Sequence, residues 1–449
     1  MSSDLKNRIL HVDGDSFFAS CEIALDEKLQ GRPVWVGGGR RGDGIVIAAN
    51  RVAKKFGVTT GMACFEAKRI CPRGVLCRPH YDEYRRISAE MFQVLEQYSP
   101  MLVPISIDEG FLDLTTMDRV VWRNSSPEKY VRGICEHITR EVKIPVSAGL
   151  GNSSRLAKLA TDAAKPGFLE VKQGEEREFL KDRSVRDLSG IGKNRQRSLA
   201  ALGALTFGHV ARMPSPLLKK KFGIWGTQLW LFANGLWNEP LLLEVKDRTT
   251  ISSNTTLPYD EPEHEAALTF ALSEATRLVG QLRREQLQAR EMSLTIRFSD
   301  FSEVGGTHRF CAPQFLNSVI NAALEGIFRE VMNRQFKPVR QIRIAFWNLA
   351  RLDTQPTLWG RTEAERWGAL DAATSKLNQK FGNTSLMTGA QLALRQLDDA
   401  HKNPKAKCPF APQREIVKKL WGTDADPLAH KNDVTRRLAK VSKQIQFKH

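Results

Sequence analysis

Five carboxylates in the sequence lie on or beside two short apolar segments. They are Asp13, Asp15, Asp108, Glu109 and Asp113. An ionised carboxylate inside a strand loses its hydration, which costs several kcal/mol unless a cation compensates the charge. Carboxylate oxygens that converge from two neighbouring strands are the ligands that Mg²⁺ prefers, with water and substrate phosphates completing its octahedron. The pattern indicates a magnesium site for a phosphate-bearing substrate, although carboxylates that cap turns at strand ends would explain these residues alone equally well.

The elements that carry these carboxylates are two predicted strands. The segment 9–21, ILHVDGDSFFASC, begins as a short apolar strand, and the segment 103–114, VPISIDEGFLDL, reads as a second strand with alternating sides. Asp108 and Glu109 are adjacent, and adjacent residues of a regular strand point to opposite faces. Both can reach one metal pair only if the strand bends there, which Gly110 permits. We therefore expect a bent second strand.

The rest of the chain divides into segments of different composition. Helical spacing covers 83–99, and 147–167 reads as a strand, a turn and a helix. Two helix–glycine–helix patterns follow within 172–238. From 251 to 349 strands and helices alternate in the order β-α-β-β-α-β, which predicts a compact α+β module. The tail, 350–449, is polar and rich in lysine.

The charge balance favours a polyanionic partner. Lys and Arg total 67 and Asp and Glu total 50, a net charge of +17 at pH 7. Such a surface binds nucleic acid by releasing condensed counterions, although a solvated basic surface would give the same balance. No apolar run approaches the roughly 18 residues of a membrane helix, the N-terminus lacks a signal-peptide core, and the seven cysteines form no paired CxxC motifs. We therefore expect a soluble cytosolic protein without a disulfide framework or a zinc site.

Three segments resemble motifs of the Y-family DNA polymerases, the error-tolerant enzymes of lesion bypass. VDGDSFFASCE at 12–22 resembles the first palm motif of that family, SIDEGFLDL at 106–114 its second, and SAGLGNSSRLAKLATDAAKPG at 147–167 its third. The motifs occur in the family's order and at its separations, which makes them a far stronger signal than any single acidic pair. The resemblance covers roughly 8–240 well, and over 251–349 it holds in the pattern of elements.

The resemblance implies an α+β multidomain fold shaped like a right hand. Its parts would be a palm at 1–21 and 76–171, fingers at 22–75, a helix-hairpin-helix thumb at 172–238, a linker at 239–250, a β-α-β-β-α-β little finger at 251–349 and a C-terminal tail at 350–449. It also implies a monomeric cytoplasmic enzyme of the bacterial nucleoid. That enzyme would add dNTPs to a primer–template in translesion synthesis, with low fidelity and without proofreading.

The carboxylates take roles from this resemblance. Asp13 and Asp108 would bridge two Mg²⁺ ions, for which Mn²⁺ can substitute. Glu109 would hold the catalytic ion, and the carbonyl of Gly14 would complete the nucleotide-bound site. The ions would lower the pKa of the primer 3′-hydroxyl that attacks the α-phosphate and would neutralise the developing charge. The motifs contain two further carboxylates, Asp15 and Asp113, which we interpret as structural residues.

The nucleotide contacts follow the family in part. Phe18 takes the place of the aromatic residue under the sugar, where a ring excludes a ribose 2′-hydroxyl. Phe17 beside it, also in the nucleotide-binding segment, is interpreted as core or backbone support. Lys165 matches the lysine that reaches the triphosphate. In the fingers the chain departs from the common Tyr-x-x-Arg and has Arg51-x-x-Lys54. Lys54 can act as a point charge on the β- and γ-phosphates, and Arg51 would supply the bidentate fork or contact template phosphate.

The implied DNA contacts carry no sequence information. Gly190 and Gly192, followed by Lys193, resemble a helix-hairpin-helix, in which backbone N–H groups and a helix N-terminus approach a phosphate. A simple αα turn would explain the same residues. The little-finger residues expected to follow the DNA backbone, unless they are ordinary exposed charges, are Arg290, Arg297, Arg309, Arg340 and Arg343.

A short peptide beyond the last predicted strand indicates a protein partner. Gln355-x-x-Leu358-Trp359 resembles the peptide that binds the bacterial sliding clamp. In that docking mode a segment presents large apolar side chains to an apolar groove.

Two other functions compete with an active polymerase. A catalytically silent relative that binds the clamp and other partners is disfavoured because the three predicted metal ligands are all present. A helix-hairpin-helix DNA-binding protein or nuclease would leave the three palm motifs unexplained.

Overall fold

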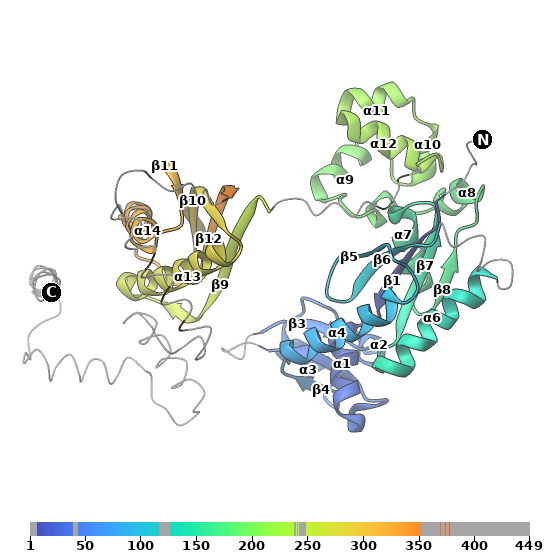
Figure 1. The fold of residues 1–449 in the computed structure, drawn as a ribbon, viewed down its shortest axis with the longest axis horizontal. Coiled ribbons are helices and arrows are strands. Elements are labelled where there is room, and N and C mark those ends of the chain that lie inside the picture. Colours follow the sequence, from blue (N-terminus) through green and yellow to red (C-terminus); the bar gives the residue numbers. More distant parts are fainter. Residues whose placement is uncertain are drawn as a thin grey trace, which may run out of the picture. The chain divides into compact units, whose positions relative to one another are not determined.

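The computed structural model describes residues 7–38, 44–115, 126–237 and 248–351, and a few single residues outside them. The chain forms two compact units, Met1–Lys246 and Asp247–His449 (Figure 1). The division falls inside the segment predicted as a linker, 239–250.

The predicted palm contains a five-stranded sheet in the order β5-β6-β1-β7-β8. Its strands are β1 (Ile9–Gly14), β5 (Leu102–Pro104), β6 (Glu109–Asp113), β7 (Val146–Gly151) and β8 (Phe168–Glu170). The central strand β1 is antiparallel to both β6 and β7. Pleating sends alternate side chains of β1 to opposite faces. Leu10 and Val12 join the core formed with helices α4 (Tyr81–Glu96) and α6 (Pro127–Val142).

The other face of the palm sheet is covered by helix α7 (Ser154–Ala164). This face carries Ile9, which packs against Ala157 of the helix. It also carries His11, whose Nδ1 lies 2.9 Å from Thr161 Oγ1. Asp13 continues the same alternation, so it faces α7 as well.

The prediction of one alternating strand over 103–114 is wrong. The chain forms a hairpin there, in which β5 and β6 pair antiparallel and Val103 lies opposite Phe111. The turn is closed at Ile105, whose backbone N–H donates to the carbonyl of Glu109. Asp108 therefore lies in the turn and Glu109 begins the strand, so strand alternation does not separate their side chains. The bend precedes Glu109 and does not require Gly110.

The predicted fingers contain a three-stranded sheet in the order β3-β2-β4. Its strands are β2 (Val34–Gly37), β3 (Val46–Ala49) and β4 (Val75–Cys77), and its helices are α2 (Arg51–Lys55) and α3 (Cys64–Ile70), with α1 (Phe17–Leu25) and the 3₁₀ turn η1 (Glu27–Leu29) before it. Asn50 caps α2, since its side chain accepts hydrogen bonds from the N–H groups of Ala53 and Val34. The expected boundary at 75/76 falls inside β4.

The predicted thumb is a cluster of short helices (Figure 1). They are α8 (Glu176–Leu180), α9 (Lys193–Ala200), α10 (Phe207–Arg212), α11 (Ser215–Phe222) and α12 (Ile224–Ala233), with the 3₁₀ turn η2 (Val185–Asp187). Helices α11 and α12 approach closely at Gly226, where a Cβ atom would lie 2.1 Å from the carbonyl oxygen of Leu218.

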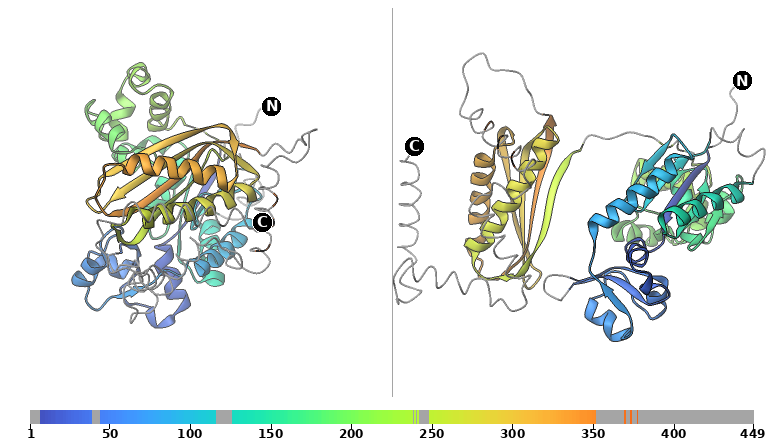
Figure 2. Two further views of the ribbon diagram at one scale, coloured as in Figure 1. Left: turned by 90° about the vertical axis from the view of Figure 1, so that its left-hand side faces the viewer. Right: turned by 60° about the horizontal axis from the view of Figure 1, so that its bottom comes forward.

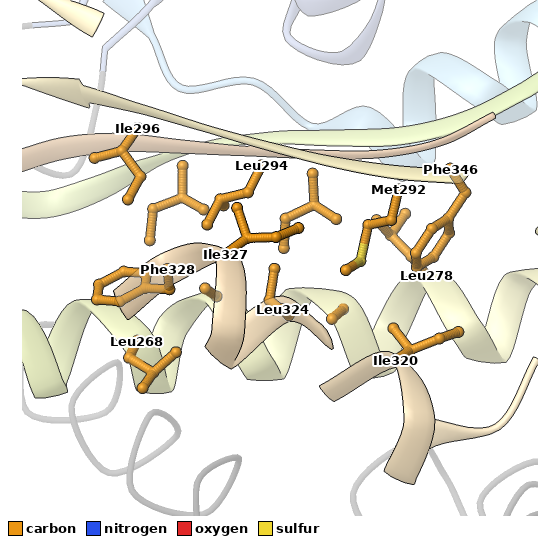
Figure 3. Packing of buried hydrophobic residues seen from close by; sticks show 14 of the residues in the cluster. Leu268, Leu278, Met292, Leu294, Ile296, Ile320, Leu324, Ile327, Phe328 and Phe346 are labelled. Carbon is orange, nitrogen blue, oxygen red and sulfur yellow. The ribbon is translucent and has the colours of Figure 1, made fainter. Parts of the chain in front are cut away.

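The second unit confirms the predicted β-α-β-β-α-β order. Its elements are β9 (Thr250–Glu261), α13 (His264–Arg284), β10 (Leu287–Phe298), β11 (Glu303–Gln314), α14 (Asn317–Met332) and β12 (Val339–Arg351), with the strands ordered β11-β10-β12-β9. Both helices lie on one face of the sheet (Figure 2, right). Figure 3 shows Leu294 and Ile296 of the sheet pointing toward Leu324 and Phe328 of α14. The opposite face of the sheet carries no helix of this unit among the described residues.

No helix in the described ranges has both the length and the apolar character that crossing a bilayer requires.

The contact between β7 and α7 gives the first testable prediction. A Cβ atom at Gly149 would lie 2.3 Å from the carbonyl oxygen of Ala157 and from the backbone nitrogen of Thr161. Gly149→Ala should therefore push α7 from the sheet and lower the free energy of unfolding by about 1–3 kcal/mol, as measured by urea denaturation. Gly133→Ala in α6 is the matched control, because a Cβ there meets nothing within 4 Å. Equal stability of the two variants would contradict this packing.

Candidate active site

The predicted catalytic carboxylates meet at the edge where β1 ends and β6 begins. Asp13 and Glu109 are direct partners in the antiparallel pairing of these strands, so their side chains share one face of the sheet. Asp108 lies beside them in the hairpin turn, where its carbonyl oxygen accepts a 2.8 Å hydrogen bond from Gly14 N–H. Its carboxylate accepts a 2.5 Å hydrogen bond from Ser106 Oγ.

Asp13 is the most deeply placed of the three carboxylates. It is 8% exposed, and Lys165 Nζ lies 2.7 Å from its Oδ1. Burial, with a smaller contribution from the charges of Asp108 and Glu109, raises the pKa of Asp13 to about 6 against the opposing effect of Lys165. A carboxylate with a raised pKa beside two others is a place where an added cation is strongly stabilised.

Glu109 belongs to a second charge-compensated pair on the same face. Burial alone would raise its pKa, but the hydrogen bond and the charge of Lys158 hold that pKa below its usual value. His11 lies behind Glu109, with its Nε2 3.6 Å from Glu109 Oε2 and its side chain fully buried. Burial, followed by the charge of Lys158, lowers the pKa of His11 to about 3, so its imidazole is neutral.

The donor set fits a hard divalent cation in type, because it consists of carboxylate oxygens and a backbone carbonyl. In the described part of the chain, no three His, Cys, Asp or Glu side chains converge on one point. Instead, the ammonium groups of Lys165 and Lys158 neutralise Asp13 and Glu109. Gly14 leaves room beside Asp108, since a Cβ there would lie 3.5 Å from the Asp108 Cβ and 3.0 Å from the ring of Phe17.

The turn between β1 and α1 brings the fingers to the same edge. Ser16 adopts a left-handed conformation with φ of 50°, which reverses the chain directly after the acidic strand end. Lys54 of α2 donates a 2.9 Å hydrogen bond to Ser16 Oγ. The charges of Lys165, Lys54 and Arg51 all act on Asp15, so three cations predicted to bind the triphosphate gather around this turn.

The carboxylates predicted to be structural have local partners. Asp15 accepts hydrogen bonds of 2.8 and 2.9 Å from Ser147 Oγ on β7. Asp113 accepts a 2.8 Å hydrogen bond from the backbone N–H of Thr115.

The two adjacent phenylalanines have different surroundings. Phe17 is 3% exposed and belongs to the palm core, in keeping with its expected part as core or backbone support beside Phe18. Phe18 is only partly buried and stacks on Tyr84, with ring centroids 4.8 Å apart and planes inclined by 26°.

The thumb residues predicted to approach DNA lie at an exposed turn. Gly190 has a φ of +90°, and neither it nor Gly192 has an atom within 4 Å of an added Cβ. Lys193 begins α9 and is exposed. The guanidinium group of Arg195 already has partners within the thumb. It donates a hydrogen bond to the carbonyl of Gly190 and lies over the ring of Trp225.

Three of the predicted little-finger arginines share the face of the sheet opposite its helices. Arg343 pairs with Thr295, and Arg297 with Gln341, in the β10–β12 register, and Arg309 lies opposite Glu291 across β10–β11. The buried residues Ile342 and Ile344 flank Arg343 on the helix side. The last two predicted arginines differ: Arg290 lies at a register irregularity of β10, and Arg340 at one of β12.

The clamp-type peptide, Gln355, Leu358 and Trp359, lies outside the described residues.

Two residues of the site were absent from the predictions. His11 shares the face of Asp13 because the two are alternate residues of one strand, with only Val12 between them. Lys158 and Lys165 are seven residues apart, which places them on one side of α7. Both periodicities were available in the sequence, but only the structure shows that this side of α7 faces the carboxylates.

Comparison with known proteins places the chain in a family. Residues 12–162 match the impB/mucB/samB family, and residues 248–358 match the C-terminal domain of that family. The chain is 33% identical over 398 residues to DNA polymerase IV of Dehalococcoides mccartyi strain ATCC BAA-2266, covering 87% of this chain and 99% of the relative. It is 30% identical over 394 residues to DNA polymerase IV 1 of Bacillus subtilis strain 168, covering 86% and 94%.

Solved structures share the fold. A chimera of the Y-family DNA polymerases Dbh and Dpo4 superposes with a TM-score of 0.67, at 24% identity and over 77% of this chain and 99% of the chimera. DinB from Sulfolobus solfataricus superposes with a TM-score of 0.51, at 24% identity and over 76% of this chain and 98% of the other. The chain therefore belongs to the impB/mucB/samB family, the Y family of DNA-directed DNA polymerases.

Proposed function

We propose that this polymerase extends primers past template lesions by two-metal nucleotidyl transfer and has no proofreading activity. The observation that carries the proposal is the direct opposition of Asp13 and Glu109 across β1 and β6, with Asp108 in the adjoining turn. Three carboxylates at one strand edge, surrounded by lysines from the palm and the fingers, suit a reaction between a triphosphate and a hydroxyl group.

Asp13, Asp108, Glu109 and the carbonyl of Gly14 would hold two Mg²⁺ ions, or Mn²⁺ in their place. When bound, these ions lower the pKa of the primer hydroxyl and neutralise charge on the attacking and leaving oxygens. His11 supports Glu109 from behind as a neutral imidazole and adds no positive charge to the site.

The basic residues around the β1–α1 turn would bind and orient the triphosphate. Lys165 lies 2.7 Å from Asp13, within reach of a phosphate oxygen that approaches the same carboxylate. Lys54 is held at Ser16 Oγ and supplies a point charge from the fingers. Arg51, at the start of the same helix, offers the planar fork that Lys54 lacks.

Phe18 would select the sugar of the incoming nucleotide. Its ring is partly exposed next to this turn and is backed by a second ring. A packed ring yields little to an added oxygen atom, so a ribose 2′-hydroxyl meets a steric penalty.

The thumb turn and the open face of the little-finger sheet would bind the DNA backbone. Arg297, Arg309 and Arg343 share that face with Thr295 and Gly305, and Arg297 is paired there with Glu303. Contacts of this type give affinity without sequence preference.

Gln355, Leu358 and Trp359 would dock the chain on a bacterial sliding clamp. The protein would act as a monomer on primer–template in the cytoplasm, at the nucleoid.

A catalytically silent scaffold is the alternative function. Such a scaffold would not need Asp13 and Glu109 or the lysines that compensate their charges. Buried carboxylates reduce stability, so a protein without the catalytic function would gain nothing from keeping them.

The metal-ligand assignment predicts a specific loss of chemistry. Asp108→Asn and Glu109→Gln should each lower primer extension about 100- to 1,000-fold, the scale of removing one transition-state stabilising group. Affinity for primer–template should stay near the wild-type value, because it depends on phosphate contacts. Single-turnover extension and fluorescence anisotropy measure the two quantities. Asp113→Asn is the matched control, since its oxygen still accepts from Thr115 N–H, and extension at a normal rate by Asp108→Asn would contradict the assignment.

The sugar-gate assignment predicts a change of selectivity. Phe18→Ala should raise kcat/KM for a ribonucleotide about 100-fold relative to that for the matching deoxynucleotide, because steric exclusion of one oxygen is worth about 1–3 kcal/mol. Phe65→Ala, at a phenylalanine of α3 that is 70% exposed, serves as the control. A folded and active Phe18→Ala variant with an unchanged ratio would remove Phe18 from the site.

A further inference from the structure

Phe18 forms a cluster of three aromatic rings with two tyrosines of α4. Phe18 stacks on Tyr84 and meets the ring of Tyr81 edge-on, with centroids 6.1 Å apart. Tyr81 in turn meets Tyr84 edge-on at 5.8 Å. Tyr84 is fully buried, so a tightly packed ring of α4 lies behind the Phe18 side chain of α1.

The hydroxyl group of Tyr84 donates a hydrogen bond to a buried carboxylate, that of Glu22. Glu22 is 5% exposed, and His80 Nδ1 lies 2.9 Å from the same carboxylate oxygen. Glu22 follows Phe18 by four residues on α1, so the two side chains lie on one side of that helix. Helix α1 therefore carries both Phe18 and Glu22, and Glu22 accepts the hydrogen bond from Tyr84, the ring behind Phe18.

This pair is better suited to orientation than to packing. Two apolar side chains would join α1 to α4 without removing a charge from water, which is costly. A hydrogen bond to a carboxylate is directional and fixes the position of the phenol oxygen, and with it the tilt of the ring. Burial and the Glu22 carboxylate both raise the pKa of the Tyr84 hydroxyl, so it remains a donor at neutral pH.

We propose that Glu22 and Tyr84 are positioning residues for sugar selection. By fixing the Tyr84 ring, the Glu22 carboxylate keeps Phe18 from moving aside when a ribonucleotide enters. This role rests on the proposed function of Phe18 as the sugar gate.

The test is the double variant Glu22→Leu/Tyr84→Phe, assayed by kcat/KM for a matched dNTP and rNTP pair. Removal of both partners of a buried hydrogen bond is close to neutral for stability, and His80, which also loses Glu22, is 60% exposed and can bond to water instead. The urea midpoint should therefore stay near that of the wild type. Discrimination against the ribonucleotide should fall about tenfold, the scale of one hydrogen bond to a charged group. The kcat for the dNTP should change less than about threefold.

Two matched variants separate positioning from general structure. Glu22→Gln should keep wild-type discrimination, because its amide oxygen still accepts from Tyr84. Tyr98→Phe removes another tyrosine hydroxyl of the palm, which lies 2.7 Å from His137 Nδ1, and should leave the ratio unchanged.

An unchanged ratio in the double variant overturns the proposal, as does a parallel loss of both activities together with stability. If the double variant does not fold, the same ratio measured for Tyr84→Phe alone tests the proposal.

Phe18→Ala distinguishes failure of the positioning role from failure of the sugar gate itself. If that variant loses discrimination while the Glu22 and Tyr84 variants keep it, the gate stands and only the positioning role fails. If Phe18→Ala itself keeps discrimination, the gate fails and the positioning role with it.

Discussion

The antiparallel pairing of β1 with β6 puts two like charges, Asp13 and Glu109, directly opposite each other on a partly buried sheet face. Such an arrangement is unfavourable unless positive charge is supplied. Lys158 of helix α7 and Lys165, which directly follows the helix, supply it, and α7 can lie close enough only because Gly149 has no side chain. The active site is therefore a consequence of how one helix packs on one strand pair.

The same strand end also organises the nucleotide contacts. The left-handed residue Ser16 turns β1 into α1 within two residues, so the helix that carries Phe18 starts directly beside Asp13. Lys54 of the fingers is held at this turn. At its far side, α1 is joined to α4 by Glu22 and Tyr84. The proposed metal ligands, phosphate contacts and sugar contact thus share a single short connection, in which a small shift would disturb all three.

Much of this was accessible from the sequence, because its signals are local. The alternation over 251–349 predicted the order of the little-finger elements, and the motifs predicted that Asp13, Asp108 and Glu109 would lie together. The hairpin at 103–114 was missed because two short strands and a turn of mixed residues mimic one alternating strand. Lys158 was missed because sequence spacing gives the face of a helix and not what that face touches. Phe17 was expected to be core or backbone support, but the packing of Phe18 against Tyr84 of α4 is a tertiary contact that no local pattern reports.

The metal-ligand proposal requires bound divalent ions to replace Lys158 and Lys165 in neutralising Asp13 and Glu109 when substrates are present. EPR can measure this as Mn²⁺ binding to complexes with a dideoxy-terminated primer–template and the matching dNTP. The wild type should bind two ions per chain, in keeping with a two-metal site, and Asp13→Asn should lose at least one of them. Equal uptake of Mn²⁺ by Asp13→Asn and the wild type would contradict the assignment of Asp13 as a metal ligand.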